Sequence, residues 1–182
     1  PLFVSGASGG VGSFAVALLA GRGFEVVAAS GKREAHAWLK ELGAASTVGR
    51  EELGEPSPRP LLKGAYAGGV DTVGGPTLAN LLKSTAYGGV VAACGLVQSP
   101  ALEVNVYPFI LRGVTLVGIE SAQASMELRR EVWGRLAGEW RPRNLEGFVA
   151  AEVGLDGLDE QVERILAGGV RGRVLVRLAG EG

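Results

Sequence analysis

The fold is decided by the stretch Val4-Ser5-Gly6-Ala7-Ser8-Gly9-Gly10-Val11-Gly12. It follows a short apolar run and precedes a segment whose apolar side chains suit a buried helix. Aligned with the pattern G-x-G-x-x-G, the stretch places Ala7, Gly9 and Gly12 at the three defining positions. Gly9 leaves room for a pyrophosphate against the backbone, and Gly12 allows the helix to pack closely on the strand. This context predicts a dinucleotide whose phosphates lie at the N-terminus of the helix.

Apolar runs typical of buried strands alternate with helical patterns along most of the chain. Strands are predicted at residues 2–5, 25–30, 45–48, 69–73, 90–94, 114–119, 148–153 and 173–178. Helices are predicted at residues 13–21, 32–42, 76–84, 124–140 and 158–167, with a helical turn at 108–111 and a loop at 51–61. The strands are apolar throughout, which indicates a parallel sheet covered on both faces. We therefore expect an α/β protein of the doubly wound, Rossmann type.

Composition limits the kinds of partner. The 182 residues are 47% hydrophobic and 20% charged, which is enough to form the core of one domain. The net charge of −1 gives no long-range field for nucleic acid or an anionic membrane, so we expect neither as a partner. Cys94 and His36 are the only cysteine and histidine, which excludes a disulfide framework and a multi-histidine metal site and fits a reducing cytoplasm. We expect no bound metal, and we interpret Cys94 as a small core residue and His36 as a surface residue.

The end of the second strand indicates which dinucleotide is bound. A site for NAD normally places Asp or Glu there, where the carboxylate holds the ribose hydroxyls. This sequence instead reads Ser30-Gly31-Lys32-Arg33 before its first carboxylate, Glu34. A hydroxyl and two cations favour a 2′-phosphate, because each charge-assisted hydrogen bond contributes about 1.5–3 kcal/mol. We therefore predict NADPH as the cofactor, with Arg50 as a further candidate at its adenosine end.

Five stretches together resemble the medium-chain dehydrogenase/reductase superfamily, in its zinc-free quinone oxidoreductase branch and closest to the acrylyl-CoA reductases. They are residues 4–12, Ser30-Gly31-Lys32, Asp71-Thr72-Val73-Gly74, residues 87–96 (Tyr-Gly-Gly-Val-Val-Ala-Ala-Cys-Gly-Leu) and Pro108-Phe109-Ile110-Leu111-Arg112. The resemblance runs almost from end to end. It implies an enzyme that transfers a hydride from NADPH to an activated alkene, such as acrylyl-CoA or another enoyl thioester, or to a quinone. It assigns no catalytic residue, and Tyr87 and Tyr107 are the only candidate proton donors.

The resemblance also implies a domain arrangement and a set of cofactor contacts. Residues 1–146 would form the NADPH-binding domain, and residues 147–182 would return to a GroES-like barrel that we expect to be missing from the N-terminal side. The cofactor contacts would be Ser8, Gly9, Gly10 and Val11 at the pyrophosphate, Ser30, Gly31, Lys32, Arg33 and Arg50 near the 2′-phosphate, Leu96 and Ile110 beside the nicotinamide, and Ser121. Members of the family commonly dimerise through an edge strand, here residues 114–119, from Val114 to Ile119. Without the barrel, apolar surface around residues 148–153 and 173–178 should be exposed.

Two other functions are compatible with parts of this pattern. A non-catalytic NADPH-binding module that senses redox state would keep the cofactor site but transfer no hydride. A nucleotide-dependent methyltransferase shares the glycine turn, but it normally keeps an acidic residue after the second strand, which is missing here. Two further motifs are absent from the sequence: no lysine follows Gly12 as in a P-loop, and no Tyr-x-x-x-Lys marks a short-chain dehydrogenase.

Overall fold

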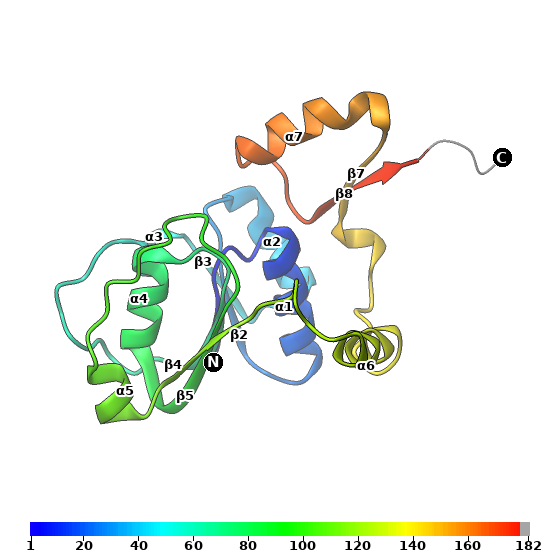
Figure 1. The fold of residues 1–182 in the computed structure, drawn as a ribbon. Helices are drawn as coiled ribbons and strands as arrows, with labels where there is room; N and C mark the ends of the chain where they lie inside the picture. Colours follow the sequence, from blue (N-terminus) through cyan, green and yellow to red (C-terminus); the bar gives the residue numbers. More distant parts are fainter. Residues whose placement is uncertain (179–182) are drawn as a thin grey trace.

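The computed structural model of the protein describes residues 1–178 and contains two β-sheets (Figure 1). The large sheet contains β1 (Leu2–Val4), β2 (Val26–Ala29), β3 (Ser46–Val48), β4 (Tyr66–Asp71), β5 (Thr85–Ala93) and β6 (Thr115–Gly118). A separate pair is formed by β7 (Val149–Gly154) and β8 (Arg173–Arg177). Neighbouring strands are parallel in both sheets.

The large sheet has the strand order β3-β2-β1-β4-β5-β6. The central strand β1 pairs with β2 and β4, which places Leu2 opposite both Val26 and Gly68. In this order the chain winds away from β1 in both directions, so the loops after β1 and β4 diverge and leave a crevice at the carboxyl ends of the strands. The predicted fold class, a doubly wound parallel sheet of the Rossmann type, is confirmed.

Helices cover both faces of the large sheet. The described residues form the helices α1 (Gly10–Gly21), α2 (His36–Glu41), α3 (Glu51–Gly54), α4 (Gly75–Ser84), α5 (Tyr107–Arg112), α6 (Met126–Ala137) and α7 (Leu158–Leu166), with short 3-10 turns η1 (Arg33–Ala35), η2 (Glu146–Phe148) and η3 (Leu155–Gly157). Of these, α1 to α4 pack on the large sheet. One buried cluster joins the sheet to α3 and α4 through Leu53 and Leu81, and a second joins it to α1 and α2 through Val16 and Leu39. Within residues 1–178, no helix is both long and apolar enough to cross a membrane.

The prediction of a loop over residues 51–61 is wrong for its first four residues, because residues 51–54 form α3. Leu53 in this helix is buried in the cluster between α4 and the sheet, which stabilises the helical turn. The prolines that suggested a loop begin only at Pro56 and therefore do not prevent it. The predicted helix at 32–42 is divided into η1 and α2, and the helix predicted at 124–140 ends at Ala137.

Two strands begin earlier than predicted. β4 begins at Tyr66, whose ring packs on Phe3 with the ring centroids 5.0 Å apart. β5 begins at Thr85, directly after α4, and residues 86–89 bulge out before pairing resumes between Gly68 and Val90. This bulge carries Tyr87, whose side chain points to solvent and is 85% exposed.

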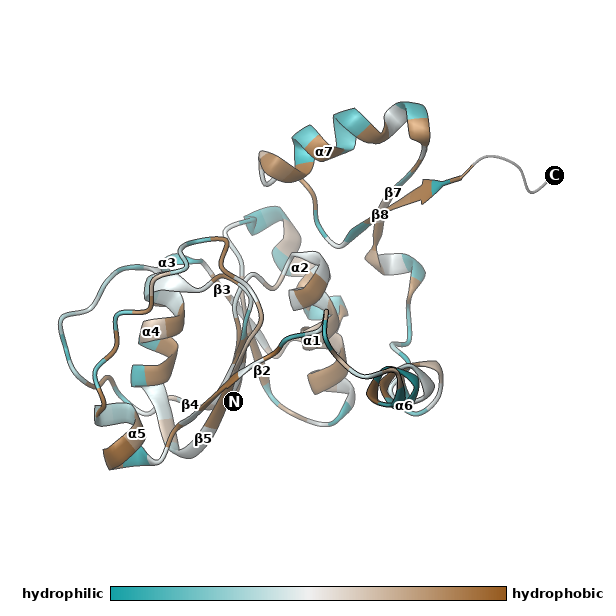
Figure 2. Ribbon diagram, in the orientation of Figure 1, coloured by the Kyte–Doolittle hydropathy of each residue, from teal (hydrophilic) through white to brown (hydrophobic). Residues whose placement is uncertain are grey.

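The C-terminal segment contacts the rest of the domain at two places, around Phe148 and at residues 172–173, where β8 begins. Phe148 is buried and stacks on Phe14 with the ring centroids 4.3 Å apart, and the indole N–H of Trp38 donates to the Gly147 carbonyl at 2.9 Å. Apart from these contacts, β7, α7 and the later part of β8 extend away from the large sheet (Figure 1). Hydrophobic and hydrophilic residues alternate along α7 (Figure 2), and Leu166 on this helix is 81% exposed.

Candidate functional site

The turn between β1 and α1 is shaped by glycine. Gly6 has a φ of +55°, and its carbonyl accepts the N–H of Gly9 at 2.9 Å. A Cβ on Gly12 would collide with the Gly6 carbonyl oxygen, so α1 approaches β1 this closely only because residue 12 has no side chain. The helix begins at Gly10 without a side-chain cap. Its first N–H groups are therefore available to an anion, and the helix dipole favours one at this end.

The end of β2 meets this turn through two hydroxyl groups. The Oγ atoms of Ser8 and Ser30 lie 2.7 Å apart, both buried, and Ser30 Oγ also accepts the N–H of Lys32 at 3.1 Å. His36 Nε2 lies 3.1 Å from the Ser30 carbonyl oxygen, and its side chain is half-buried. His36 is therefore only partly exposed at the surface, and the sequence did not indicate that its ring contacts the end of β2.

Two cations lie beside Ser30. The side chain of Arg50 packs on Gly31, and a Cβ on Gly31 would lie 3.1 Å from Arg50 Cδ. Within residues 1–178, neither Lys32 nor Arg50 forms an ion pair with a carboxylate. Their charges are therefore not neutralised by a neighbouring acidic side chain, which suits the binding of an anionic group.

A buried carboxylate fixes the opposite wall of the crevice. Asp71 accepts the Ser5 hydroxyl at 2.7 Å and the N–H of Gly74 at 2.7 Å, and Ser5 Oγ accepts the N–H of Thr72 at 2.9 Å. Burial raises the pKa of the Asp71 carboxyl above its ordinary value, although the hydrogen bonds from Ser5, Gly74 and Val73 lower it in part. This network ties the turn after β1 to the loop after β4.

The C-terminal segment returns to the glycine turn. The N–H of Gly172 donates to the Ser8 carbonyl at 2.9 Å, and a Cβ on Gly10 would lie 2.5 Å from Arg173 Cζ. The Arg173 guanidinium thus lies against the N-terminus of α1, where its planar set of donors suits a pyrophosphate. Sequence reasoning missed Arg173, because this contact joins opposite ends of the chain. The only local signal is the glycine-rich context of Gly168, Gly169 and Gly172.

These parts surround a cavity of about 680 Å³ at the carboxyl ends of the central strands. The predicted site residues in its wall are Ser8, Gly9, Gly10, Ser30, Gly31, Lys32 and Arg50. The wall also contains residues that sequence reasoning did not place there, among them Thr72, Val73, Thr77, Val97 and Arg173. Thr72 and Val73 belong to the quoted stretch 71–74, but their role in the wall follows only from the strand order, which places β4 next to β1.

Five of the predicted site residues lie outside this wall, and their contacts with a cofactor stay predictions. They are Val11, Arg33, Leu96, Ile110 and Ser121, all of them exposed. Val11 instead lines a neighbouring apolar groove together with Phe14 and Trp133.

The candidate reactive side chains also lie outside the wall. Tyr107 begins α5, as predicted, and Tyr87 lies on the bulge of β5. Cys94 directly follows β5 and is exposed, so its interpretation as a core residue is wrong. No catalytic side chain is assigned on this geometry.

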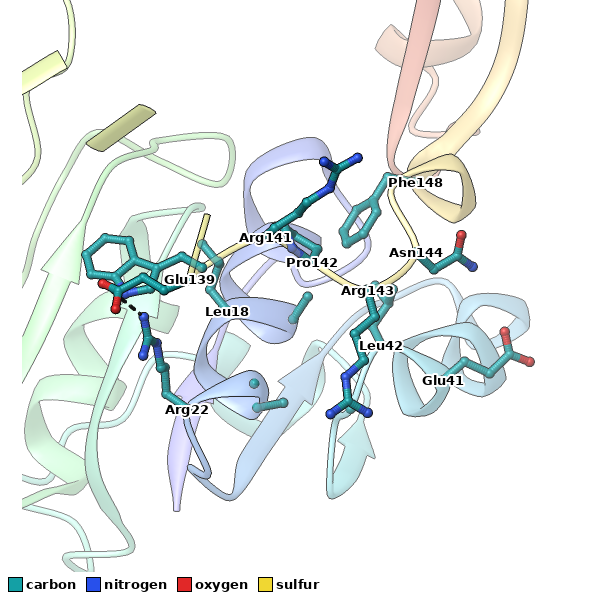
Figure 3. Close-up of a pocket in the computed structure, with 15 residues that line it drawn as sticks. Leu18, Arg22, Glu41, Leu42, Glu139, Arg141, Pro142, Arg143, Asn144 and Phe148 are labelled. Carbon is teal, nitrogen blue, oxygen red and sulfur yellow. Dashed lines mark ion pairs between the residues drawn. The ribbon is translucent and has the colours of Figure 1, made fainter. Parts of the chain in front are cut away.

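A second cavity, of about 510 Å³, lies at the other end of α1 (Figure 3). Its charged side chains are partly paired: Arg22 lies 3.5 Å from a carboxylate oxygen of Glu139 and 5.3 Å from the ring centroid of Trp140. Figure 3 shows Pro142 and Phe148 on the segment that crosses α1. This cavity lies where residues 139–148 pack on α1 and the end of α2.

The fold and the cavity together place this chain in the class of Rossmann-type α/β domains. A family model described as zinc-binding dehydrogenase matches residues 10–137. The chain belongs to this family, within the medium-chain dehydrogenase/reductase superfamily.

Relatives and solved structures agree with this assignment. Acrylyl-CoA reductase AcuI of Ruegeria pomeroyi is 43% identical over 178 residues, which cover 97% of this chain and 53% of that protein. The structure of Bacillus subtilis yhfP with NAD bound matches with a TM-score of 0.93 and 43% identity, over 97% of this chain and 54% of that one. The structure of the yhdH oxidoreductase from Salmonella enterica in complex with NADP matches with a TM-score of 0.93 and 42% identity, over 98% and 54%. This chain therefore spans about half the length of the relatives it matches.

The family description names zinc, and the residues of this chain do not fit it. Residues 1–178 contain no group of three or more His, Cys, Asp or Glu side chains that could hold a metal ion.

Proposed function

We propose that this chain is the NADPH-binding part of a reductase. The observation that carries the proposal is the single cavity that joins the glycine turn, the Ser30–Lys32 segment, Arg50 and Arg173. The cavity offers helix N–H groups and a guanidinium at one place, and a hydroxyl with two cations at another. This spacing of anion-binding groups suits a pyrophosphate and a ribose 2′-phosphate in one ligand.

The choice of NADPH over NADH rests on the end of β2. No carboxylate stands there to hold a free 2′-hydroxyl, and Lys32 and Arg50 are both free of carboxylate partners among the residues described. Solved relatives are described with NAD bound in one case and with NADP in another, so both forms occur within the family. The two cations in this chain favour the phosphorylated form.

When bound, NADPH supplies a hydride from C4 of its nicotinamide. We propose an activated alkene of an enoyl thioester, such as acrylyl-CoA, or a quinone as the acceptor. One relative is an acrylyl-CoA reductase, and another, from Bacillus subtilis, is provisionally named a quinone oxidoreductase. The residues of this chain would bind and orient the cofactor through the glycine turn, Lys32 and Arg173.

The proposal is tested by measuring binding and turnover together. NADPH binding with oxidation of NADPH by acrylyl-CoA or a quinone supports the reductase. Binding without turnover, when the polypeptide is supplied at the full length of its relatives, would instead support a non-catalytic redox-sensing module. Absence of NADPH binding at that length would contradict both.

We further propose that the groove lined by Val11, Phe14, Trp133 and Leu175 packs against a further domain. That domain would correspond to the part of the longer relatives that this chain does not cover. The groove has a volume of about 770 Å³ and a largely apolar wall, and Trp133 is 68% exposed. An apolar surface of this kind is rarely left open to solvent. Strong binding of a hydrophobic dye by residues 1–182, lost in a polypeptide of the full length of its relatives, is the expected result; no dye binding by a monomeric chain would contradict it.

We also propose a homodimer through β6. This strand is the edge of the large sheet, and Val117 on it is exposed. An open edge strand offers backbone groups to a second copy. Val117→Lys should convert a dimer to a monomer in sedimentation, whereas Val162→Lys on the exposed side of α7 should not. A monomeric wild-type protein would contradict this part of the proposal.

A further inference from the structure

The polar atoms of Ser30 all have partners in the structure. Its N–H donates to the Val48 carbonyl at 3.0 Å, and its hydroxyl lies 2.7 Å from Ser8 Oγ and accepts the N–H of Lys32 at 3.1 Å. The remaining atom, the carbonyl oxygen, lies 3.1 Å from His36 Nε2. Ser30 itself is 3% exposed. The imidazole of His36 is therefore the partner of the carbonyl oxygen in the peptide between Ser30 and Gly31.

A carbonyl oxygen can only accept, so His36 must carry a proton on Nε2 for this contact to be a hydrogen bond. Gly31 adds no side chain to stiffen the next peptide, and Lys32 has an extended backbone with φ −89° and ψ 94°. Without the imidazole, the Ser30 carbonyl would be half-buried with no donor, and the peptide could rotate. The Ser30 hydroxyl and the Lys32 ammonium would then lose their fixed positions in the cavity wall.

We infer that His36 is a positioning residue that sets the preference for NADPH over NADH without contacting the cofactor. The inference rests on the proposed function, because it concerns the 2′-phosphate end of that same site. His36 acts through the Ser30 carbonyl, which orients Ser30 and Lys32 toward the phosphate. NADH has no phosphate at this position, so its affinity should depend little on His36.

Three variants test this role through the chemistry of the side chain. The amide nitrogen of Gln reaches about as far as imidazole Nε2 and donates to a carbonyl, whereas that of Asn is shorter and alanine has no donor. His36→Ala and His36→Asn should weaken NADPH binding about five- to twentyfold, the effect of losing roughly one hydrogen bond's worth of positioning, and NADH binding less than about twofold. His36→Gln should restore NADPH binding to within about threefold of wild type. Lys40→Ala, an exposed change on the same helix, is the matched control and should change neither affinity.

A nitrogen-15 NMR spectrum provides a readout that does not depend on a variant folding. His36 is the only histidine in the chain, so its ring signals need no assignment by mutagenesis. At a pH where the ring is neutral, we expect the tautomer protonated on Nε2, and NADPH should shift its signals more than NADH does. Protonation on Nδ1 alone would overturn the inference.

The binding results distinguish failure of the proposed NADPH site from failure of the role inferred for His36. A wild-type protein without preference for NADPH would overturn the proposed function, and the inference with it. A wild-type preference that survives in folded His36→Ala, or equal losses for both cofactors, would overturn the inference alone. Failure of His36→Gln to restore NADPH binding while its thermal stability matches wild type would also overturn it.

Discussion

The hydroxyl oxygens of Ser8 and Ser30 lie 2.7 Å apart, although the first belongs to the turn after β1 and the second to the end of β2. This hydrogen bond joins the glycine turn to the segment that carries Lys32. Both side chains are buried, so the bond forms away from competing solvent. The pyrophosphate end and the 2′-phosphate end of the proposed site are therefore held in one rigid arrangement.

Ser30→Ala should affect both stability and cofactor choice. The change leaves Ser8 Oγ and the N–H of Lys32 without their partner, so we expect a loss of about 1–3 kcal/mol in the free energy of unfolding. NADPH affinity should fall by about tenfold, since the turn loses a direct and an indirect contact with the phosphate. Urea unfolding and titration measure the two effects. Ser46→Ala on β3 is the control, and an equal effect from that change would contradict the assignment.

Two glycines of α1 should respond to alanine in opposite directions. A Cβ on Gly12 would meet the Gly6 carbonyl oxygen and Ala7 Cα, both backbone atoms that cannot move freely, so Gly12→Ala should lower the free energy of unfolding by about 1–3 kcal/mol. A Cβ on Gly21 meets nothing within 4 Å, and alanine favours the helix, so Gly21→Ala should be neutral or stabilise by up to about 1 kcal/mol. Equal stabilities of the two variants in urea unfolding would show that the packing at Gly12 is not as close as described.

Arg173→Ala should weaken both cofactors alike. Its guanidinium lies at the N-terminus of α1, where a pyrophosphate common to NADPH and NADH would bind, so we expect about a tenfold loss for each. Arg177→Ala on the same strand removes an arginine whose partner is Glu152, and it should leave both affinities unchanged. A loss confined to NADPH would instead place Arg173 at the 2′-phosphate.

The buried carboxyl of Asp71 should make stability depend on pH. Its pKa is raised in the folded state, mainly by burial, so the folded protein holds this proton more tightly than the unfolded chain. The stabilising effect is present at low pH and is lost as pH rises from about 4, the ordinary value, through the raised folded pKa. The unfolding free energy of wild type minus that of Asp71→Asn should therefore fall as the pH rises from about 4 through the raised folded pKa. A difference that rises over this interval would contradict the direction of the shift.

Much of the fold follows from local pattern. The alternation of apolar runs with helical segments defines the strand and helix order, and the glycine turn identifies β1–α1 as the central unit, because only glycine fits at Gly12. The errors occur where tertiary packing outweighs local signals. Leu53 stabilises α3 inside a predicted loop, and the ring of Tyr66 extends β4 by packing on Phe3.

The candidate site was predictable where its residues follow one strand and not where the chain returns from a distance. Ser8, Ser30 and Lys32 lie at the ends of β1 and β2, so motif and spacing place them together. Arg173 reaches the same cavity from the last strand, and no short-range pattern records that contact. The contact of His36 with the Ser30 carbonyl has no signal in the sequence either, because two flanking alanines indicate only a helix position at the surface.

The most direct measurement is titration of wild type, Lys32→Ala and Lys40→Ala with NADPH and NADH side by side. We predict that wild type binds NADPH at least about tenfold more tightly than NADH, that Lys32→Ala removes most of this difference, and that Lys40→Ala preserves it. Equal affinities of wild type for the two cofactors, or a preference that Lys32→Ala leaves unchanged, would contradict a 2′-phosphate site at the end of β2.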